Sequence, residues 1–119
     1  MRNYKEHIIT KDATLKMALV ALNNLESDAI LFVVDENKKL IGSLTDGDVR
    51  RGLLKGWNIE DNVLDYIQAN PKSVNKENYS LSEIITLREQ NLKVLPVLDA
   101  AERIINVINF RHQRSYLPL

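Results

Sequence analysis

The sequence of 119 residues contains no cysteine, only four glycines and three prolines, and no excess charge, with 16 Lys+Arg against 16 Asp+Glu. Without cysteine there is no disulfide framework and no thiolate metal site, and the histidines His7 and His112 are too few for a conventional zinc site. Without a net positive charge, a dedicated nucleic-acid-binding protein is not expected. The absence of Ser-rich and single-sign charge blocks favours a chain that is folded throughout.

Long hydrophobic runs are missing as well. Residues 1–10 lack the apolar run of a signal peptide, and nowhere do about 18 apolar residues follow one another. We therefore expect a cytoplasmic protein with no membrane segment. The length allows one compact domain or two very small ones, and it excludes most large catalytic architectures.

Amphipathic and apolar segments follow one another in a definite order. Thr14 precedes leucines at helical spacing over 15–25, which predicts a capped helix. Two apolar runs joined by turn-forming polar residues predict a β-hairpin over 30–44. A second helix is predicted from the cap Thr45 to a stop at Gly56.

The same order begins again in the second half of the chain. A short helix is expected over 62–67, and it ends before Pro71 because the residue preceding a proline disfavours the helical region. Ser80 caps a further helical pattern over 81–91, and a second pair of strands follows over 94–108.

The duplication can be measured by an alignment of the two hairpins. Sliding 30–45 onto 94–109, an offset of 64, gives four identities in sixteen positions and pairs apolar with apolar residues at seven. Chance alone would give about one identity. A period of about 60 residues is too long for a solenoid repeat and too short for an independently stable domain. We expect two half-modules, 1–58 and 59–119, that share one core.

The most specific motif is LIGSLTDGDVRRGL, at the end of the first hairpin and the start of the next helix. Together with the duplication it resembles the tandem cystathionine β-synthase (CBS) domain pair over essentially the whole chain. The residues that match the family pattern are Ile41, Gly42, Leu44, Thr45 and Asp48. The fuller string TDGDVRR resembles the modules attached to sugar-phosphate isomerases and sugar-phosphate nucleotidyltransferases.

The resemblance implies an α/β (α+β) fold of two pseudo-twofold-related repeats, each a small three-stranded sheet with two helices, and two clefts between the sheets. No cofactor or metal is implied, and the possible ligands are AMP, ADP, ATP and S-adenosylmethionine. The first two strands would line the base, and the motif would hold ribose or phosphate. The implied ligand-binding residues are Ile9, Thr10, Leu31, Phe32, Thr45, Asp46, Asp48, Arg50 and Arg51.

The chemistry of the motif leaves two interpretations open. Thr45 and Asp48 have the spacing of a capping box, in which the hydroxyl and the carboxylate satisfy free N–H groups of the helix start. An ionised carboxylate also suits the paired hydroxyls of a ribose. The helix N-terminus attracts phosphate, which Asp46 and Asp48 oppose, so Arg50 and Arg51 would be needed as cations. The alternative for both arginines is a solvated helix face.

Catalytic constellations are absent from the sequence. Asp46-Gly47-Asp48 spells the Asp-x-Asp of metal-dependent glycosyltransferases, but no Gly-rich phosphate loop accompanies it. Neither His7 nor His112 has the serine or cysteine context of a triad. We therefore expect no catalysis by this chain. Gly47 costs helix stability, and either a close approach or simple tolerance explains it.

The second copy departs from the family pattern. At the same offset Asn106 replaces glycine, Asn109 replaces threonine and His112 replaces the aspartate, so the carboxylate for a ribose is lost. This argues against a nucleotide site of the usual kind in the second cleft. The cleft residues implied there are Val74, Leu95, Asn109 and His112. Arg103, Arg111 and Arg114 make the end basic, which suits an anion or a solvated terminus.

Our leading hypothesis is a ligand-sensing CBS pair that forms the N-terminal part of a sugar-phosphate nucleotidyltransferase, with an attached catalytic domain and a homodimeric state. Only ten residues follow Asn109, so the closing helix is either rudimentary or cut off, and we favour a segment of a longer polypeptide. The alternative is a ligand-free dimerisation or scaffolding module of the same kind of enzyme. No nucleic-acid or membrane partner is expected.

Overall fold

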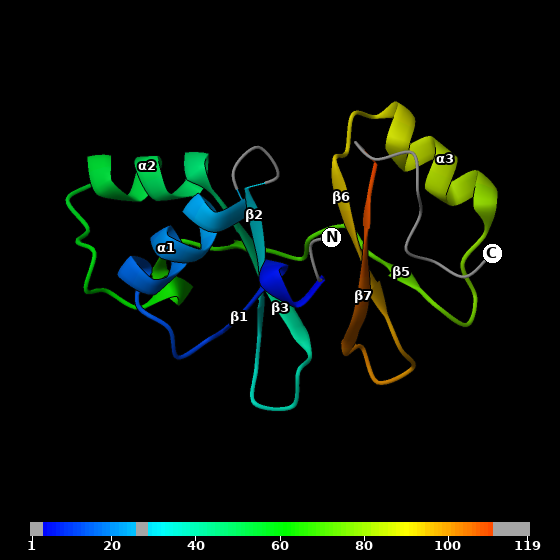
Figure 1. Ribbon diagram of the computed structural model, residues 1–119, viewed down its shortest axis with the longest axis horizontal. Helices are drawn as coiled ribbons and strands as arrows, with labels where there is room; N and C mark the ends of the chain where they lie inside the picture. The colour runs from blue at the N-terminus through cyan, green and yellow to red at the C-terminus, as the bar shows by residue number, and fades with distance from the viewer. Residues whose placement is uncertain (1–3, 26–28, 111–119) are drawn as a thin grey trace. The chain divides into compact units, whose positions relative to one another are not determined.

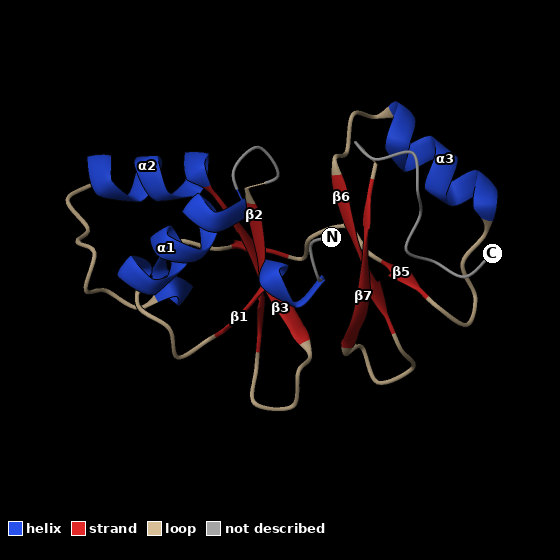
Figure 2. Cartoon of the chain, in the orientation of Figure 1, coloured by secondary structure: helices blue, strands red, loops and turns tan. Residues whose placement is uncertain are grey.

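The computed structural model describes residues 4–25 and 29–110 of the chain. The fold is mixed α+β with two small sheets, which confirms the predicted class (Figures 1 and 2). The chain divides into two compact units, Met1–Pro71 and Lys72–Leu119, and each unit has a sheet of its own.

The first unit carries most of the helices of the described chain. Its strands form a four-stranded sheet in the order β1-β2-β3-β4, in which β1 is parallel to β2 and the other neighbours are antiparallel. Helices α1 and α2 lie on one face of this sheet (Figure 1). The elements, with η for a 3-10 helix, are η1 (Tyr4–His7), β1 (Ile8–Thr10), α1 (Leu15–Leu25), β2 (Ile30–Val34), β3 (Leu40–Thr45), α2 (Asp46–Leu54), η3 (Val63–Asp65) and β4 (Gln68–Ala69). The helices predicted over 15–25 and after Thr45 are confirmed, and so is the hairpin predicted over 30–44.

The core of the first unit follows from the helical spacing of α1. One side of α1 is buried, through Leu15, Ala18, Leu22 and Leu25. It packs in one cluster with Leu31, Val33 and Leu44 of the sheet. Full burial of each of these leucine and valine side chains contributes roughly 1.5–3 kcal/mol, so α1 is anchored mainly by this face.

Helix α2 ends where the sequence predicted. Lys55 is its C-cap, and Gly56 follows with φ of 94°, a left-handed conformation that glycine adopts without steric cost. Gly52, one turn earlier, has no room for a side chain, because a Cβ there would overlap the ring of Tyr66 and lie 2.6 Å from Cε3 of Trp57. The two rings meet edge to face, with centroids 4.8 Å apart.

The short helix expected over 62–67 is reduced to the single 3-10 turn η3, which Asn62 caps by accepting from the backbone N–H of Leu64 at 2.8 Å. The chain then forms β4, a fourth strand that the sequence did not predict. β4 pairs with β3 through Gly42↔Ala69 and Ser43↔Gln68.

Gly42 makes this pairing possible. A Cβ at Gly42 would lie 2.6 Å from Cδ1 of Ile67 and 2.9 Å from the backbone oxygen of Gln68. Any larger residue would push the incoming chain away from β3. The glycine of the motif is therefore required here by a close approach of two strands.

Over its described residues, 72–110, the second unit repeats the plan with one covering helix, α3. Its sheet has the order β5-β6-β7, with β5 parallel to β6 and β7 antiparallel to β6. Its elements are β5 (Val74–Asn75), α3 (Leu81–Glu89), β6 (Val94–Leu98) and β7 (Ile104–Asn109). Ser80 caps α3 as predicted, accepting from the backbone N–H of Glu83 at 3.2 Å. The second helix expected for this repeat falls beyond residue 110, outside the described residues.

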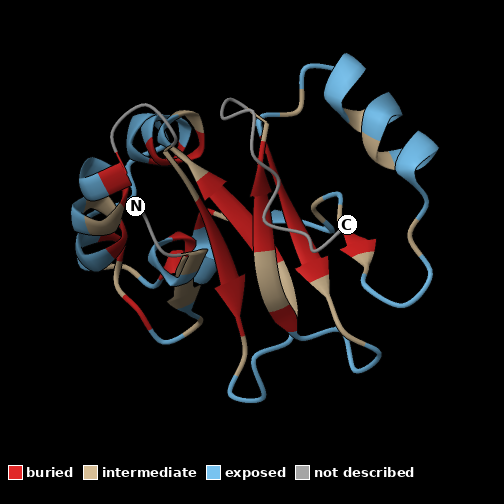
Figure 3. Cartoon of the chain, turned by 45° about the vertical axis from the view of Figure 1, so that its right-hand side comes forward, coloured by how far each residue is buried: buried red, intermediate tan, exposed pale blue. Residues whose placement is uncertain are grey.

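Helix α3 covers its sheet only loosely. None of its residues is buried, and Ile84 and Leu87 are the partly buried contacts with the small cluster of the second sheet. Leu81 and Ile85 remain 57% and 51% exposed. Figure 3 shows the contrast between the exposed helix and the buried strands.

The two hairpins share one register. Ile30 pairs with Thr45, and Val94 pairs with Asn109, which is the same pairing at an offset of 64. Both ladders also shift register near the turn, between Val33/Val34 and between Val97/Leu98. The duplication inferred from the sequence is thus a duplication of strand pairing.

The turn chemistry repeats as well. Asp35 Oδ1 accepts from the backbone N–H groups of Asn37 at 2.8 Å and Lys39 at 3.0 Å, and Lys38 has φ of 66°. These hydrogen bonds hold the pKa of Asp35 below its ordinary value, the bond from Lys39 most of all.

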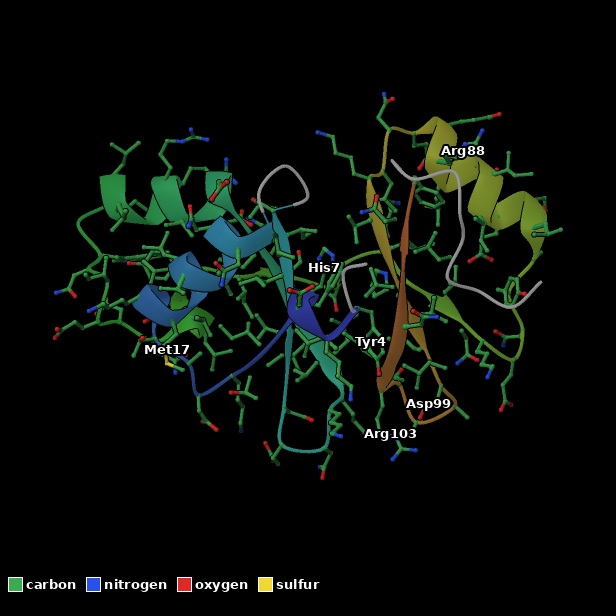
Figure 4. All side chains as sticks on the ribbon, in the orientation of Figure 1. Tyr4, His7, Met17, Arg88, Asp99 and Arg103 are labelled. Atoms are coloured by element: carbon green, nitrogen blue, oxygen red, sulfur yellow. The ribbon has the colours of Figure 1, made fainter. Side chains whose placement is uncertain are left out.

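Asp99 does the same in the second hairpin. Its Oδ1 accepts from the N–H groups of Ala101 and Arg103, each at 2.9 Å, and Glu102 has φ of 65°. The Arg103 guanidinium adds an ion pair to Asp99 Oδ2 at 2.9 Å (Figure 4). Both turns therefore have the same arrangement, in which an aspartate is followed three residues later by a residue in the left-handed conformation.

Among the helices of the described residues, none is both long and apolar enough to cross a membrane.

Candidate site at the start of helix α2

The predicted capping box forms at the junction of β3 and α2. Thr45 is the N-cap, and its hydroxyl accepts from the backbone N–H of Asp48 at 3.3 Å. In return, Asp48 Oδ2 accepts from the backbone N–H of Thr45 at 2.9 Å and from its hydroxyl at 3.0 Å. The structural interpretation of this motif is confirmed, because these bonds satisfy free N–H groups at the helix start.

The other carboxylate oxygen of Asp48 has two further partners. Oδ1 accepts from Nη2 of Arg51 at 2.7 Å and from Nε2 of Gln68 at 3.1 Å. The side chain of Asp48 is only 3% exposed, whereas that of Arg51 is 62% exposed. The junction therefore holds a buried carboxylate that is paired with a cation at the surface.

This environment favours the ionised form of Asp48. Burial by itself would raise the pKa of Asp48, but hydrogen bonds from Thr45, Arg51 and Gln68 to the carboxylate outweigh it. The pKa accordingly lies below its ordinary value of 3.8. At neutral pH the junction carries a full negative charge beside the guanidinium of Arg51.

The rest of the TDGDVRR string lies on the surface. Asp46 and Arg50 are exposed, and Gly47 is half-buried under the side chain of Arg51. Arg50 is the cation of this turn that has no ion pair with Asp48, so it keeps the character of a solvated residue. The two cations that an anionic ligand would need, Arg50 and Arg51, both lie near the helix start. Arg51 is already paired with Asp48.

The predicted base-lining residues are not gathered at this junction. Thr10 pairs with Val34 at one end of β2, whereas Thr45 pairs with Ile30 at the other end. The Val34 end and the Ile30 end of β2 are four residues apart, which is about 13 Å along the strand. Within the first unit, Thr10 and the capping box therefore lie at opposite ends of the same strand.

The remaining predicted residues of β1 and β2 are divided between the two faces of the sheet. Leu31 is fully buried in the cluster under the helices, and Ile9 packs against that cluster. Phe32 follows Leu31 in the strand and points to the opposite face, where it is 1% exposed. Leu31 and Phe32 cannot line the same surface.

In the second unit, Val74 pairs with Val97, and Leu95 pairs with Ile108. Val74 and Leu95 are both buried in its core cluster. Asn109, at the position of Thr45, is 4% exposed. His112 lies outside the described residues, as do Arg111 and Arg114.

His7 has a structural role. It is 4% exposed, and its Nδ1 lies 2.9 Å from the backbone oxygen of Ile30, which ties η1 to β2 (Figure 4). Over the described residues, no three His, Asp or Glu side chains gather as metal ligands would. Asp46 and Asp48 accordingly do not form an Asp-x-Asp metal site with a third such ligand in this part of the chain.

Gln68 is the member of the cluster that the sequence did not reveal. It lies 20 residues from Asp48 in a strand of two exposed residues, so no apolar pattern marks it. The one signal was Gly42, whose missing side chain implies that another segment passes close to β3.

Comparison with known proteins places residues 3–55 in the family model of the CBS domain. An uncharacterized protein of Helicobacter pylori is 30% identical over 113 residues, which are 94% of this chain and 34% of that protein. The arabinose 5-phosphate isomerase KdsD of Pseudomonas aeruginosa is 31% identical over 78 residues, 65% of this chain and 24% of the isomerase. The chain thus spans a quarter to a third of the length of these relatives.

Solved structures share the fold over nearly the whole chain. OpuCA of Staphylococcus aureus has a TM-score of 0.73 at 24% identity, covering 92% of this chain and 86% of that one. A CBS domain protein of Pyrobaculum aerophilum, solved in complex with AMP, has a TM-score of 0.71 at 12% identity, covering 93% and 83%. At such identities the likeness concerns the fold.

Proposed function

We propose that this chain, which has the fold of a CBS domain pair and a CBS domain over residues 3–55, is a ligand-sensing regulatory module that binds an adenine nucleotide or a related ligand. Structural neighbours solved with AMP or ATP support a ligand of this class. The candidates are AMP, ADP, ATP and S-adenosylmethionine.

The observation that carries the proposal is the polar cluster at the start of α2. The buried carboxylate of Asp48 is ionised, and it can accept a ribose hydroxyl when one of its protein donors gives way. The exposed guanidinium groups of Arg50 and Arg51 and the free N–H groups of the first helical turn can attract phosphate. Thr45 fixes the carboxylate in position through the capping box.

The module would act on a larger protein. The similarity of a part of the chain to arabinose 5-phosphate isomerases supports an enzyme of sugar phosphates as the whole protein. Attachment to a sugar-phosphate nucleotidyltransferase is the narrower prediction from the sequence. In either case the catalytic groups would belong to another domain, and the ligand would act through its different affinity for two conformations.

Thermal unfolding tests this proposal directly. The chain is heated with millimolar AMP, ADP, ATP or S-adenosylmethionine, each in separate experiments. A ligand at 100 times its dissociation constant adds about 2.7 kcal/mol to the stability of the folded state, which raises Tm by several degrees. Asp48→Ala should abolish the shift, whereas Asp65→Ala, at an exposed residue of η3, should retain it. No shift with any of the four compounds would exclude the sensor.

A second candidate function is homodimerisation without ligand. Large apolar side chains are exposed on the helices of the first unit, where Leu54 of α2 is 82% exposed and Met17 and Val20 of α1 are 58% and 57% exposed. Such side chains favour association with a second copy when they are contiguous. Sedimentation equilibrium with and without AMP distinguishes the candidates, because a scaffold dimerises equally in both conditions and a sensor binds AMP.

A further inference from the structure

The Asp48 carboxylate has no acceptor position left for a ligand. An ionised carboxylate offers about four lone-pair positions on its two oxygens. In Asp48, Oδ2 accepts from the backbone N–H and the hydroxyl of Thr45, and Oδ1 accepts from Arg51 and Gln68. A ribose hydroxyl can therefore bind this carboxylate only if one of these donors leaves.

The four donors differ in how easily they can leave. The two from Thr45 form the capping box, and losing them would expose free N–H groups of α2. The guanidinium of Arg51 makes a short, charge-assisted bond of 2.7 Å. The amide of Gln68 is neutral, its bond is longer at 3.1 Å, and the residue is exposed, so water can replace Asp48 as its partner. Gln68 is the donor that costs least to displace.

Displacement of Gln68 has a consequence beyond the site. Gln68 is half of β4, which is held to β3 by two residue pairs, Gly42↔Ala69 and Ser43↔Gln68. Directly after β4, Asn70 has φ of 55° and Pro71 ends the first unit. The hydrogen bond to Asp48 therefore ties the segment that connects the two units to the first turn of α2.

We propose that Gln68 is a displaceable latch: a ligand hydroxyl that binds Asp48 replaces its amide and thereby loosens β4, the start of the connection between the two units. This inference rests on the proposed function, because it requires a ligand with hydroxyl groups at Asp48. It adds a route by which occupancy at the start of α2 reaches the connecting segment.

Hydrogen exchange and calorimetry on the 119-residue chain test the latch with AMP as the probe. Bound ligand normally slows amide exchange, so a local increase over residues 67–70 upon saturation with AMP is the expected mark of release. The analogue 2′,3′-dideoxy-AMP, which lacks the hydroxyls, should bind without this increase. An unchanged or slower exchange over residues 67–70 with AMP would overturn the latch.

Two variants test the same point through affinity. Gln68→Leu removes the amide, and Gln68→Asn keeps it but is one methylene too short to reach Asp48. Both should bind AMP about two- to tenfold more tightly than the wild type, because no hydrogen bond has to be broken first. Gln90→Leu, at the exposed end of α3, should bind as the wild type does.

The outcomes separate the two proposals. If the wild type binds AMP and both Gln68 variants bind it equally well or less well, the latch is refuted and the sensor stands. If the wild type does not bind AMP, this latch is refuted together with the sensing of that nucleotide. Circular dichroism of each variant confirms that the comparison is made between folded proteins.

Discussion

Gly47 leaves the space in which the guanidinium of Arg51 lies. A Cβ at Gly47 would be 3.2 Å from Nη1 of Arg51, the nearest atom outside its own helix backbone and chain neighbours. The arginine crosses this first turn of α2 to reach Asp48 at 2.7 Å. The missing side chain of Gly47 thus makes room for Arg51, which lies four residues further along the same helix.

Substitution of Gly47 by alanine should be mildly stabilising. The contact at 3.2 Å involves the far end of a flexible side chain, which can shift by a few tenths of an ångström. Alanine gains about 0.5–1 kcal/mol over glycine in a helix. Urea denaturation should therefore show a slightly higher midpoint with an unchanged slope. A destabilised Gly47→Ala would mean that the position of Arg51 matters more than the contact distance implies.

Gly52→Ala, in the same helix, is the matched contrast. Its Cβ would overlap the Tyr66 ring and lie 2.6 Å from Cε3 of Trp57, and two rings packed edge to face cannot move aside easily. Overpacking of this kind costs about 1–3 kcal/mol. The same urea titration should show a lower midpoint, together with a changed near-ultraviolet signal of Trp57. Equal stability of the two glycine variants would contradict the packing described here.

The capping box makes the stability of the folded protein depend on pH. The pKa of Asp48 is lowered in the folded state, so its contribution is present above the unfolded value near 3.8 and is lost as the pH falls through the lower folded pKa. Asp48→Asn should lose about 1–3 kcal/mol at pH 7, because an amide meets donors that need an acceptor. The difference from the wild type should shrink below pH about 4.

Chemical denaturation of both proteins between pH 7 and pH 3 measures this difference. Asp46→Asn serves as the control, since Asp46 is exposed in the same helical turn and should change stability by less than about 1 kcal/mol. The difference in free energy of unfolding between the wild type and Asp48→Asn could also stay constant down to pH 3. That result would show that the charge of the carboxylate does not stabilise the site.

The sequence predicted those features that depend on neighbours along the chain. Helix α1, the caps Thr45 and Ser80, and the two hairpins carry their signals in periodicity and in short polar motifs. The alignment at an offset of 64 even placed the turns that Asp35 and Asp99 build. Interactions between residues that are close in the sequence determine such elements, so these elements can be predicted without knowledge of the fold.

Features decided by distant contacts were not predicted. β4 has two exposed residues and no apolar alternation, and it exists because Gly42 lets Ile67 approach β3. Residues 62–67 accordingly hold only a single 3-10 turn before the chain enters the sheet at β4. For this reason the sequence did not indicate Gln68 as the fourth donor to Asp48, although it did indicate Thr45 and Asp48.

Gly42→Ala should detach β4. Its Cβ would lie 2.9 Å from a backbone oxygen, which cannot swing away as the end of Arg51 can at Gly47. We expect a loss of about 1–3 kcal/mol and faster amide exchange at Gln68 and Ala69. Gly47→Ala is the control, because it makes the same chemical change without the backbone contact. Normal exchange at β4 in Gly42→Ala would contradict the role assigned to this glycine.

The equivalent hairpin turns should respond alike to glycine. Lys38 and Glu102 have φ of 66° and 65°, and a left-handed conformation is unfavourable for residues with a Cβ. Replacing either by glycine should stabilise the protein by about 0.5–1 kcal/mol, after the greater entropy of the unfolded glycine is deducted. Urea denaturation of Lys38→Gly, Glu102→Gly and the double variant should give similar, additive gains, because the two turns belong to different units.

Lys39→Gly is the matched control for the first turn. Lys39 is the next residue in the chain, its φ is not positive, and its backbone N–H donates to Asp35 Oδ1 at 3.0 Å. Glycine there adds only unfolded-state entropy, so the variant should be destabilised by about 0.5–1 kcal/mol. If Lys39→Gly stabilises the protein as Lys38→Gly does, the effect is not conformational. If Lys38→Gly and Glu102→Gly differ in sign, the two turns are not physically equivalent, and the duplication of strand pairing does not extend to the energetics of the turns.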